Sequence, residues 1–380
     1  MKKSTLLKLW YVLLSLIIIL GLITAVRVFT EGSGHLFHAD DNMPWTLLIA
    51  TYTFFVLTST GATIIASLST VFGYQRYDHM VKRAIYIGLI TLIAGFVAMG
   101  LELGNPLNML NYFLSPNFAS PIWWMGLFYM CLFVILTYKF WHIHTKNTHT
   151  KLTKVLAVMA LVLEVGALST LGAVFGLIEA RPTFFGEYIL AYFLFTALLS
   201  GISAILFFSI SYYSIVENGI PQRLKRSFDS LTKILGAIIA VTLLFSIWHM
   251  VIGLYSARPE FDVMHYMINS MYYKMEILIG LIIPLAMMIV PNIRQSTKGK
   301  LIAAVLIFIG LGIGRMDMVM LGQIQPIVPR YTEASNIISY FPTFWEWVIS
   351  VFALALMLML YTLGEQFLKL ETHKEKPKAD

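Results

Sequence analysis

Charge is scarce in this 380-residue chain. Asp, Glu, Lys and Arg make up 12% of it, about half of their share in an average soluble domain, whereas 58% of the residues are hydrophobic. The mean hydropathy of +0.77 is too high for an ordinary globular protein. The composition therefore predicts an all-α, polytopic membrane protein.

Cysteine and suitably placed histidine are also lacking. The single cysteine, Cys131, excludes a disulfide framework, a thiolate-bound iron–sulfur cluster and a Cys-rich zinc site. A membrane haem of the cytochrome b type needs two facing ligands, but of the nine histidines only His249 falls within an apolar run. A basic cytoplasmic loop explains His142, His144 and His149 better than a metal site does. We therefore expect neither haem nor metal in this chain.

Apolar runs of membrane-spanning length dominate what is present. The first of them is long and has no small-residue cleavage site after it, which favours a retained helix over a signal peptide. The ten predicted spans are 9–28, 44–72, 84–103, 121–141, 155–178, 187–216, 234–255, 266–290, 301–321 and 343–364.

The positive charges alternate between the connections as the positive-inside rule requires. With the N-terminus in the cytoplasm, all but six of the 27 Lys and Arg residues fall on the cytoplasmic side. The six are Arg27, Arg181, Arg258, Lys274, Arg315 and Arg330, of which Lys274 and Arg315 lie well inside predicted spans. The pattern predicts that both termini are cytoplasmic, and it makes the net charge of +7 a topology signal and not a nucleic-acid footprint.

A weak internal repeat follows from a shift of 140 positions. It aligns Tyr52 with Tyr192, Phe55 with Phe195, and Gly61 with Gly201. So few matches can also arise by chance in so aromatic a chain. A real repeat would make spans two to five and six to nine two related four-helix bundles, with the first and tenth helices peripheral. The corresponding parts are 1–43 (first helix and outer loop), 44–178 (first bundle), 179–322 (second bundle) and 323–380 (outer loop, last helix and tail).

Ionisable residues inside the spans are candidates for function, because such groups are costly in lipid and are usually buried in protein. The candidates for a proton path are Glu164, His249, Lys274, Glu276, Arg315 and Asp317. Lys274 and Glu276 are expected at the depth of Arg315 and Asp317, which predicts a buried ionic cluster between the eighth and ninth spans. A structural clamp and a proton-handling group remain equal alternatives for this cluster.

The outer face gathers polar residues at the mouths of the second and third spans. Asp41 and Asn42 suit the N-terminus of a helix, and Pro44 suits its first turn. Acids and amides around an apolar slot would suit a lipophilic ligand with carbonyl groups, although an interfacial aromatic belt is the default interpretation. The candidate ligand-binding residues are Asp41, Asn42, Trp45, Tyr52, Glu102 and Asn105.

Several motifs in sequence order carry a resemblance to a known family. They are Asn42-Met43-Pro44-Trp45, Leu101-Glu102-Leu103-Gly104-Asn105-Pro106, Ser120-Pro121-Ile122-Trp123-Trp124, Arg181-Pro182, the stretch 273–284 with Glu276 and Gly280, and Tyr340-Phe341-Pro342-Thr343-Phe344-Trp345-Glu346. Together they resemble the membrane subunit of polysulfide reductase and its NrfD-like relatives. The ten-span form is similar to the membrane subunits of periplasmic hydrogenases and of alternative complex III.

The resemblance implies a haem-free, quinone-binding subunit of a respiratory oxidoreductase in the bacterial plasma (inner) membrane. Menaquinone is favoured over ubiquinone, and the site would lie near the outer face of the first bundle, lined by Trp45, Tyr52 and Glu102. Glu276 would match an acid used for protons, whereas Asn105 stands where relatives commonly have Arg. Electrons would pass to or from a ferredoxin-like iron–sulfur subunit outside, which connects to a catalytic molybdenum or nickel subunit. The chain would not be catalytic alone.

Two rival functions remain at this point. The repeat and the predicted ionic cluster would also suit a secondary transporter or a proton channel. A passive membrane anchor for soluble subunits is the other alternative, although acids deep in the spans argue against it.

Overall fold

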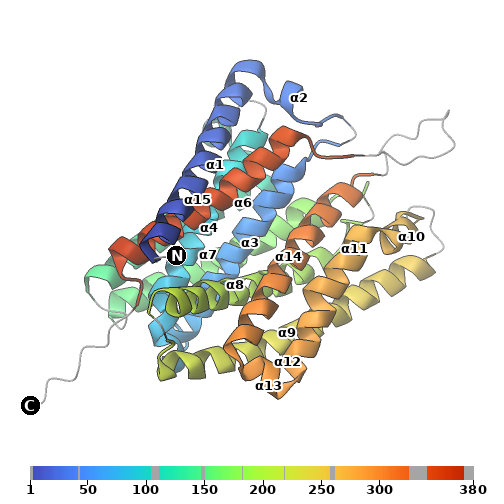
Figure 1. Ribbon diagram of the computed structural model, residues 1–380. Helices are drawn as coiled ribbons and strands as arrows, with labels where there is room; N and C mark the ends of the chain where they lie inside the picture. The colour runs from blue at the N-terminus through green and yellow to red at the C-terminus, as the bar shows by residue number, and fades with distance from the viewer. Residues whose placement is uncertain are drawn as a thin grey trace, which may run out of the picture.

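The computed structural model describes residues 3–41, 43–103, 111–146, 150–181, 183–217, 219–256, 262–324 and 340–371. This part of the chain contains helices and no strands, and ten of the helices are long and apolar enough to cross a membrane (Figure 1). They are α1 (Lys3–Glu31), α3 (Leu47–Thr70), α4 (Val81–Glu102), α6 (Pro121–Thr145), α7 (Lys151–Gly176), α8 (Tyr188–Ile215), α9 (Gln222–Tyr255), α11 to α12 (Met271–Ile289), α14 (Thr297–Leu321) and α15 (Phe344–Leu368). The predicted all-α, ten-span membrane protein is confirmed.

Eight of these helices form two closed rings. In the first, α3, α4, α6 and α7 pack successively and α7 returns to α3; in the second, α8, α9, α12 and α14 do the same. The rings meet mainly through α3 and α8, while α15 packs on α4 and α1 packs on α15. We call the end of the molecule near α2 (Ser33–Leu36) and α10 (Asp262–Asn269) the outer end, following the charge pattern; α13 (Pro291–Gln295) marks the cytoplasmic end (Figure 1).

The two rings touch backbone to backbone where α3 crosses α8. A Cβ atom on Gly61 would stand 1.7 Å from the carbonyl oxygen of Ala197, and one on Gly201 would stand 2.2 Å from the carbonyl carbon of Gly61. Only glycine permits so close an approach. Gly61 and Gly201 are equivalent under the shift of 140 residues, so the helices of the two bundles cross at corresponding points.

The eighth span departs from the continuous helix predicted over residues 266–290. Helix α10 ends at Asn269, and Ser270 caps the next helix by accepting from Tyr272 N at 3.2 Å. This helix, α11 (Met271–Met275), continues into a π-helical segment, η4 (Glu276–Ile282). The span is completed by α12 (Ile283–Ile289). Serine interrupts the helix here because its hydroxyl satisfies an amide at the start of the next one. Lys274 therefore lies near the start of the span and not eight residues inside it.

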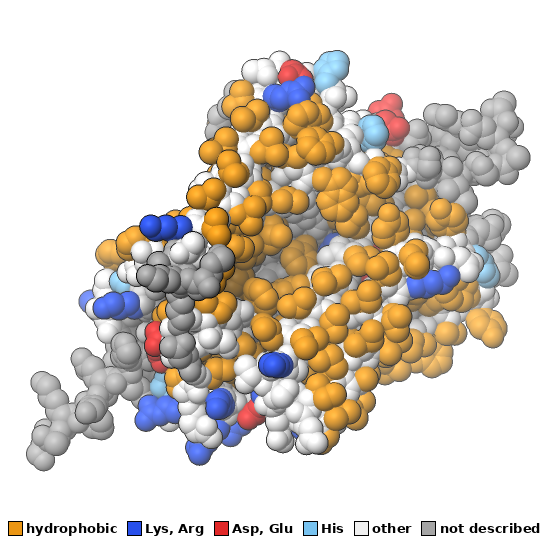
Figure 2. Space-filling view, viewed as in Figure 1, with side chains coloured by type: hydrophobic (Ala, Val, Ile, Leu, Met, Phe, Trp, Pro, Cys, Tyr) orange, Lys and Arg blue, Asp and Glu red, His pale blue; other side chains and the backbone are white. Residues whose placement is uncertain are grey.

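Four cations predicted in or beside cytoplasmic connections lie within helices and are buried, namely Lys82, Arg83, Lys139 and Lys300. Arg83 is fully enclosed and pairs with Glu365 of α15 at 2.7 Å. The helices extend past the predicted ends because the membrane-length apolar run does not mark where the helical backbone stops. Broad hydrophobic surface covers the visible sides of the molecule, and Lys and Arg gather mainly toward its cytoplasmic edge (Figure 2).

Replacing Gly201 with alanine should destabilise the protein. The new methyl group would force α3 and α8 apart, and overpacking of this kind costs about 1–3 kcal/mol. Thermal unfolding of the detergent-solubilised chain should therefore shift down by several degrees. Gly312→Ala in α14 is the matched control, because nothing lies within 4 Å of a Cβ built there. Equal unfolding temperatures for both variants and the unmodified chain would contradict a tight crossing.

Candidate functional site

The mouth of α3 is capped differently from the prediction. The helix begins at Leu47, and Thr46 is its N-cap, accepting from Leu48 N at 3.2 Å. The expectation that Asp41 caps this helix is wrong: its side chain is exposed, and the neighbouring Asp40 accepts from Met43 N at 2.7 Å. Asn42 and Asn105 lie outside the described residues.

Two carboxylates from other helices complete this cap. Glu102, the last residue of α4, accepts from Thr46 N at 2.8 Å and from Thr46 Oγ1 at 2.5 Å. Glu346, fully buried in the first turn of α15, accepts from Leu47 N at 3.5 Å, from His38 N at 2.9 Å and from the hydroxyl of Tyr340. Free amides and the helix dipole make the N-terminus of α3 favourable for negative charge. Glu102, predicted as a ligand-binding residue, thus also stabilises the N-terminus of α3 through Thr46.

Sequence reasoning placed Tyr340 and Glu346 in a family motif but not in the site. Burial and the hydrogen bond to Glu346 raise the pKa of Tyr340 above its usual range, so its hydroxyl stays protonated and donates. The available signal was an acid in the first turn of an apolar helix, six residues after a tyrosine.

Trp45 lies where the two bundles meet at the outer end. Its backbone exchanges two hydrogen bonds with the side chain of Gln323, at 3.1 and 3.0 Å. Its indole packs against Phe175 and Phe184, with ring centroids 4.9 and 5.8 Å away. Trp45 therefore packs in the contact between the two bundles, and it directly precedes Thr46, which Glu102 contacts.

Tyr52 lies more than a turn deeper and faces α6. It is 4% exposed, and its hydroxyl lies 3.7 Å from the sulfur of Met125, a weak acceptor. Tyr129 of α6, which sequence reasoning missed, is fully buried, and its hydroxyl has no hydrogen-bond partner among the described residues. Two buried hydroxyls therefore retain donor capacity in the outer half of the first bundle. Tyr129 stands eight residues after the predicted start of its span, and a tyrosine at that depth could have been recognised as a candidate from the sequence.

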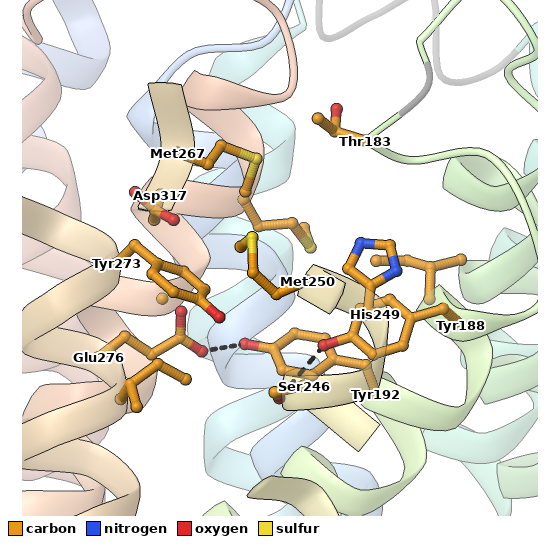
Figure 3. A pocket seen from close by; sticks show the side chains of 14 residues that line it. Thr183, Tyr188, Tyr192, Ser246, His249, Met250, Met267, Tyr273, Glu276 and Asp317 are labelled. Atoms are coloured by element: carbon orange, nitrogen blue, oxygen red, sulfur yellow. Dashed lines mark hydrogen bonds between the residues drawn. The ribbon is translucent and has the colours of Figure 1, made fainter. Parts of the chain in front are cut away.

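The second bundle holds a cavity of about 50 Å³ in its outer half (Figure 3). Glu276, at the start of the π-helical turn, accepts a hydrogen bond from the hydroxyl of Tyr192. The rings of Tyr188 and His249 stack with centroids 3.7 Å apart, and Asp317 reaches the cavity from α14. A water molecule needs about 10–15 Å³, so the cavity has room for a few waters beside two carboxyl groups.

A glycine makes room for the Glu276 carboxyl group. A Cβ atom on Gly314 of α14 would stand 2.4 Å from its carboxyl carbon, and Gly280 of the π-helical turn approaches Gly310 backbone to backbone. The π-helical turn and the small residues facing it place an ionisable group against a bare helix surface. Such turns are frequent at functional sites.

The predicted ionic cluster is only partly present. Lys274 is exposed and donates to the carbonyl oxygen of Asn269 at 3.1 Å, so it does not belong to the cluster. Arg315 is buried, donates to Thr196 Oγ1 and lies over the ring of Tyr192 at 4.9 Å. Asp317 lies 3.4 Å from Ser270 Oγ. The described residues contain no ion pair between Arg315 and either acid, because aromatic rings and hydroxyls surround the guanidinium group.

The first bundle contains a buried acid and a buried cation that face no hydrogen-bond partner in the described part of the chain. Lys139 of α6 and Glu164 of α7 are both fully buried, and they interact electrostatically. Sequence reasoning named Glu164 but counted Lys139 among the cytoplasmic charges. The second bundle likewise carries buried charge on its third and fourth helices, where the acids Glu276 and Asp317 accompany Arg315. Unpartnered buried charges are so costly that such groups are hydrated or neutralised.

A double replacement tests whether Lys139 and Glu164 act as a pair. Lys139→Met or Glu164→Gln alone leaves one buried charge uncompensated, which should cost about 3–5 kcal/mol, whereas the double variant should cost clearly less than the sum. Thermal unfolding of the four proteins in one detergent measures the coupling. Strictly additive losses would show that the two side chains are independent.

Fold and interior together define a helical, multi-pass membrane protein with buried ionisable residues in both bundles. The described residues contain no group of three or more His, Cys, Asp or Glu that could hold a metal ion. The sequence profile of the polysulphide reductase NrfD family matches residues 35–328, and the chain belongs to this family.

Relatives with functional names align along nearly the whole chain. A selenate reductase subunit of Mesobacillus selenatarsenatis is 22% identical, over 94% of this chain and 93% of the relative. The Hdr-like menaquinol oxidoreductase integral membrane subunit of Archaeoglobus fulgidus is 22% identical, over 92% and 91%. The menaquinone reductase integral membrane subunit of Nitratidesulfovibrio vulgaris is 23% identical, over 92% and 88%. The chain is similar to membrane subunits of several different oxidoreductases.

Proposed function

We propose that this chain is the quinone-interacting membrane subunit of a respiratory oxidoreductase complex. Membership of the NrfD family over residues 35–328 carries the proposal. Two relatives that align along nearly the whole chain are named for menaquinol and menaquinone, which favours menaquinone as the quinone here. A passive anchor would not need acids and cations buried in both bundles.

The proposed quinone site is the outer half of the first bundle. A quinone has two carbonyl oxygens that accept hydrogen bonds, and when bound it supplies the redox chemistry that the chain itself lacks. The hydroxyls of Tyr52 and Tyr129 fit that need, because neither has a strong acceptor among the described residues. Trp45 forms part of the apolar wall. Asp41, Asn42 and Asn105 stay candidates for the mouth of the site.

Glu102 is the proposed proton-exchanging group of this site. Its carboxyl group is partly buried at the outer end of α4 and is held in place by Thr46. A carboxyl group fixed beside both an apolar interior and the outer surface can take up a proton from one side and release it to the other. Its contact with the start of α3 fixes the geometry for that exchange.

The electron partner in this proposal is a ferredoxin-like iron–sulfur subunit that docks on the outer end. One cysteine in the whole chain cannot hold such a cluster. The relative named for selenate reductase supports a catalytic subunit beyond it, and a molybdenum or nickel centre is the class we propose.

Replacing Glu102 with glutamine should lower quinone-linked turnover of the assembled complex about 100-fold, the usual contribution of a general acid or base. Glutamine can still accept from Thr46, so the fold should be retained. Turnover with an artificial dye that bypasses the quinone should not change. Glu31→Gln, on the exposed side of α1, is the control and should behave as the unmodified complex does. Full quinone-linked turnover in the Glu102 variant would contradict the assignment.

The second bundle supports an additional proton-handling function, which its cavity specifically favours. Glu276, Asp317 and His249 line one small space with room for water. Tyr192 connects Glu276 to α8, and Arg315 lies against the same ring. We propose that protons enter or leave at this cavity, in a complex whose redox site is in the first bundle. A separate transporter or proton channel is the alternative use of the same groups.

Glu276→Gln should lower the number of protons moved per electron when the complex turns over in sealed vesicles. The variant removes the titratable group but keeps an acceptor for Tyr192. A pH-sensitive dye outside the vesicles measures the ratio, and dye-linked electron transfer serves as the activity reference. Lys274→Gln, an exposed change two residues away, should leave the ratio unaltered. An unchanged ratio in the Glu276 variant would exclude this residue from proton movement.

A further inference from the structure

A second cavity, of about 220 Å³, lies at the cytoplasmic ends of α8, α9 and α14. Ile210, Ile220 and Phe228 form its apolar side, and Lys225, Asp229 and Lys300 form its polar side. The turn between α13 and α14 closes it. The cavity is more than ten times larger than one water molecule requires. It is remote from both sites described above, because those lie in the outer half of the molecule.

The surroundings of this cavity are strongly basic. Residues 216–233 and 291–300 carry seven Lys and Arg residues but only two acids. One of the acids, Asp229, is engaged by Lys300 at 2.7 Å, and Lys300 Nζ also donates to the carbonyl oxygen of Gln295 at 2.7 Å. Lys225 is exposed and remains as the cation at the cavity that no described acid neutralises. The cavity therefore suits an anion.

The position of the cavity distinguishes a lipid from a soluble anion. Three membrane-spanning helices end around it, and one of its sides is apolar. At the end of α8, Ile215 and Val216 expose 65% and 52% of their surfaces, so apolar side chains also face outward at the cytoplasmic end of this helix. Basic pockets between helices at the cytoplasmic face commonly hold anionic lipid headgroups. A soluble phosphate would use the cations but would leave the apolar side unfilled.

We propose that this cavity binds the phosphate-bearing headgroup of an anionic phospholipid from the cytoplasmic leaflet. Lys225 contacts the phosphate, Lys300 and Asp229 form the fixed polar side, and Ile220 and Phe228 contact the glycerol and the start of an acyl chain. The bound lipid ties together α8, α9 and α14, three of the four helical elements of the second bundle.

The test is thermal unfolding of the purified full-length chain, delipidated in a neutral detergent and titrated with phosphatidylglycerol, phosphatidylcholine or inorganic phosphate. Phosphatidylglycerol should raise the unfolding temperature saturably, and the other two should not. Lys225→Gln should increase the half-saturating phosphatidylglycerol concentration about tenfold, as expected for loss of one charge-assisted hydrogen bond.

Lys233→Gln is the matched control, because Lys233 is an exposed lysine of the same helix that does not line the cavity. It removes the same charge and should leave the half-saturating concentration within about twofold. Equal effects of the two variants would show that general surface charge accounts for the binding, which would overturn the proposal. An equal response to phosphatidylcholine would mean non-specific solvation by lipid, and a saturable response to inorganic phosphate would mean a soluble-anion site; each would also overturn it.

Discussion

The backbone contact between Gly61 and Gly201 fixes the arrangement of everything else in this protein. Lipid offers no hydrophobic drive for helices to associate, so close packing of small residues has to hold two bundles together. The crossing of α3 and α8 does this near the middle of both helices. Trp45, on the approach to α3, and Tyr192, on α8, have different surroundings. One belongs to the joint at the first bundle and the other to the cavity of the second.

Both bundles bury charged side chains, but the residues differ between them. Each places an acid and a cation on its third and fourth helices, as Lys139 and Glu164 in the first and as Glu276 and Arg315 in the second. Neither pair forms a direct ion pair in the described residues. Separated buried charges are unfavourable unless water or a bound proton compensates them. Such groups are therefore found more often at functional sites than in interiors that only stabilise the fold.

Sequence alone predicted the fold class, the ten spans and the family, because apolar length and the alternation of Lys and Arg are properties of whole segments. It could not place single residues as well. Ser270 divides the eighth span because its hydroxyl competes as a helix cap, and this removed Lys274 from the expected cluster. Lys139 was counted with the cytoplasmic charges because it stands two residues before the predicted end of its span, whereas α6 continues to Thr145. The cap of α3 moved from Asp41 to Thr46 because Glu102 and Glu346, distant in sequence, supply the negative charge. The last of these is a tertiary effect that a local pattern does not contain.

In the function proposed for this chain, quinone binds in the outer half of the first bundle and not in the cavity of the second. Photolabelling of the assembled complex with a menaquinone analogue that carries an azide on its ring tests this most directly. We expect label on α3 and α6, near Tyr52 and Tyr129, that excess unmodified menaquinone competes away. Competable label confined to the region of Tyr188, His249 and Tyr273 would contradict this assignment and would place the quinone in the second bundle.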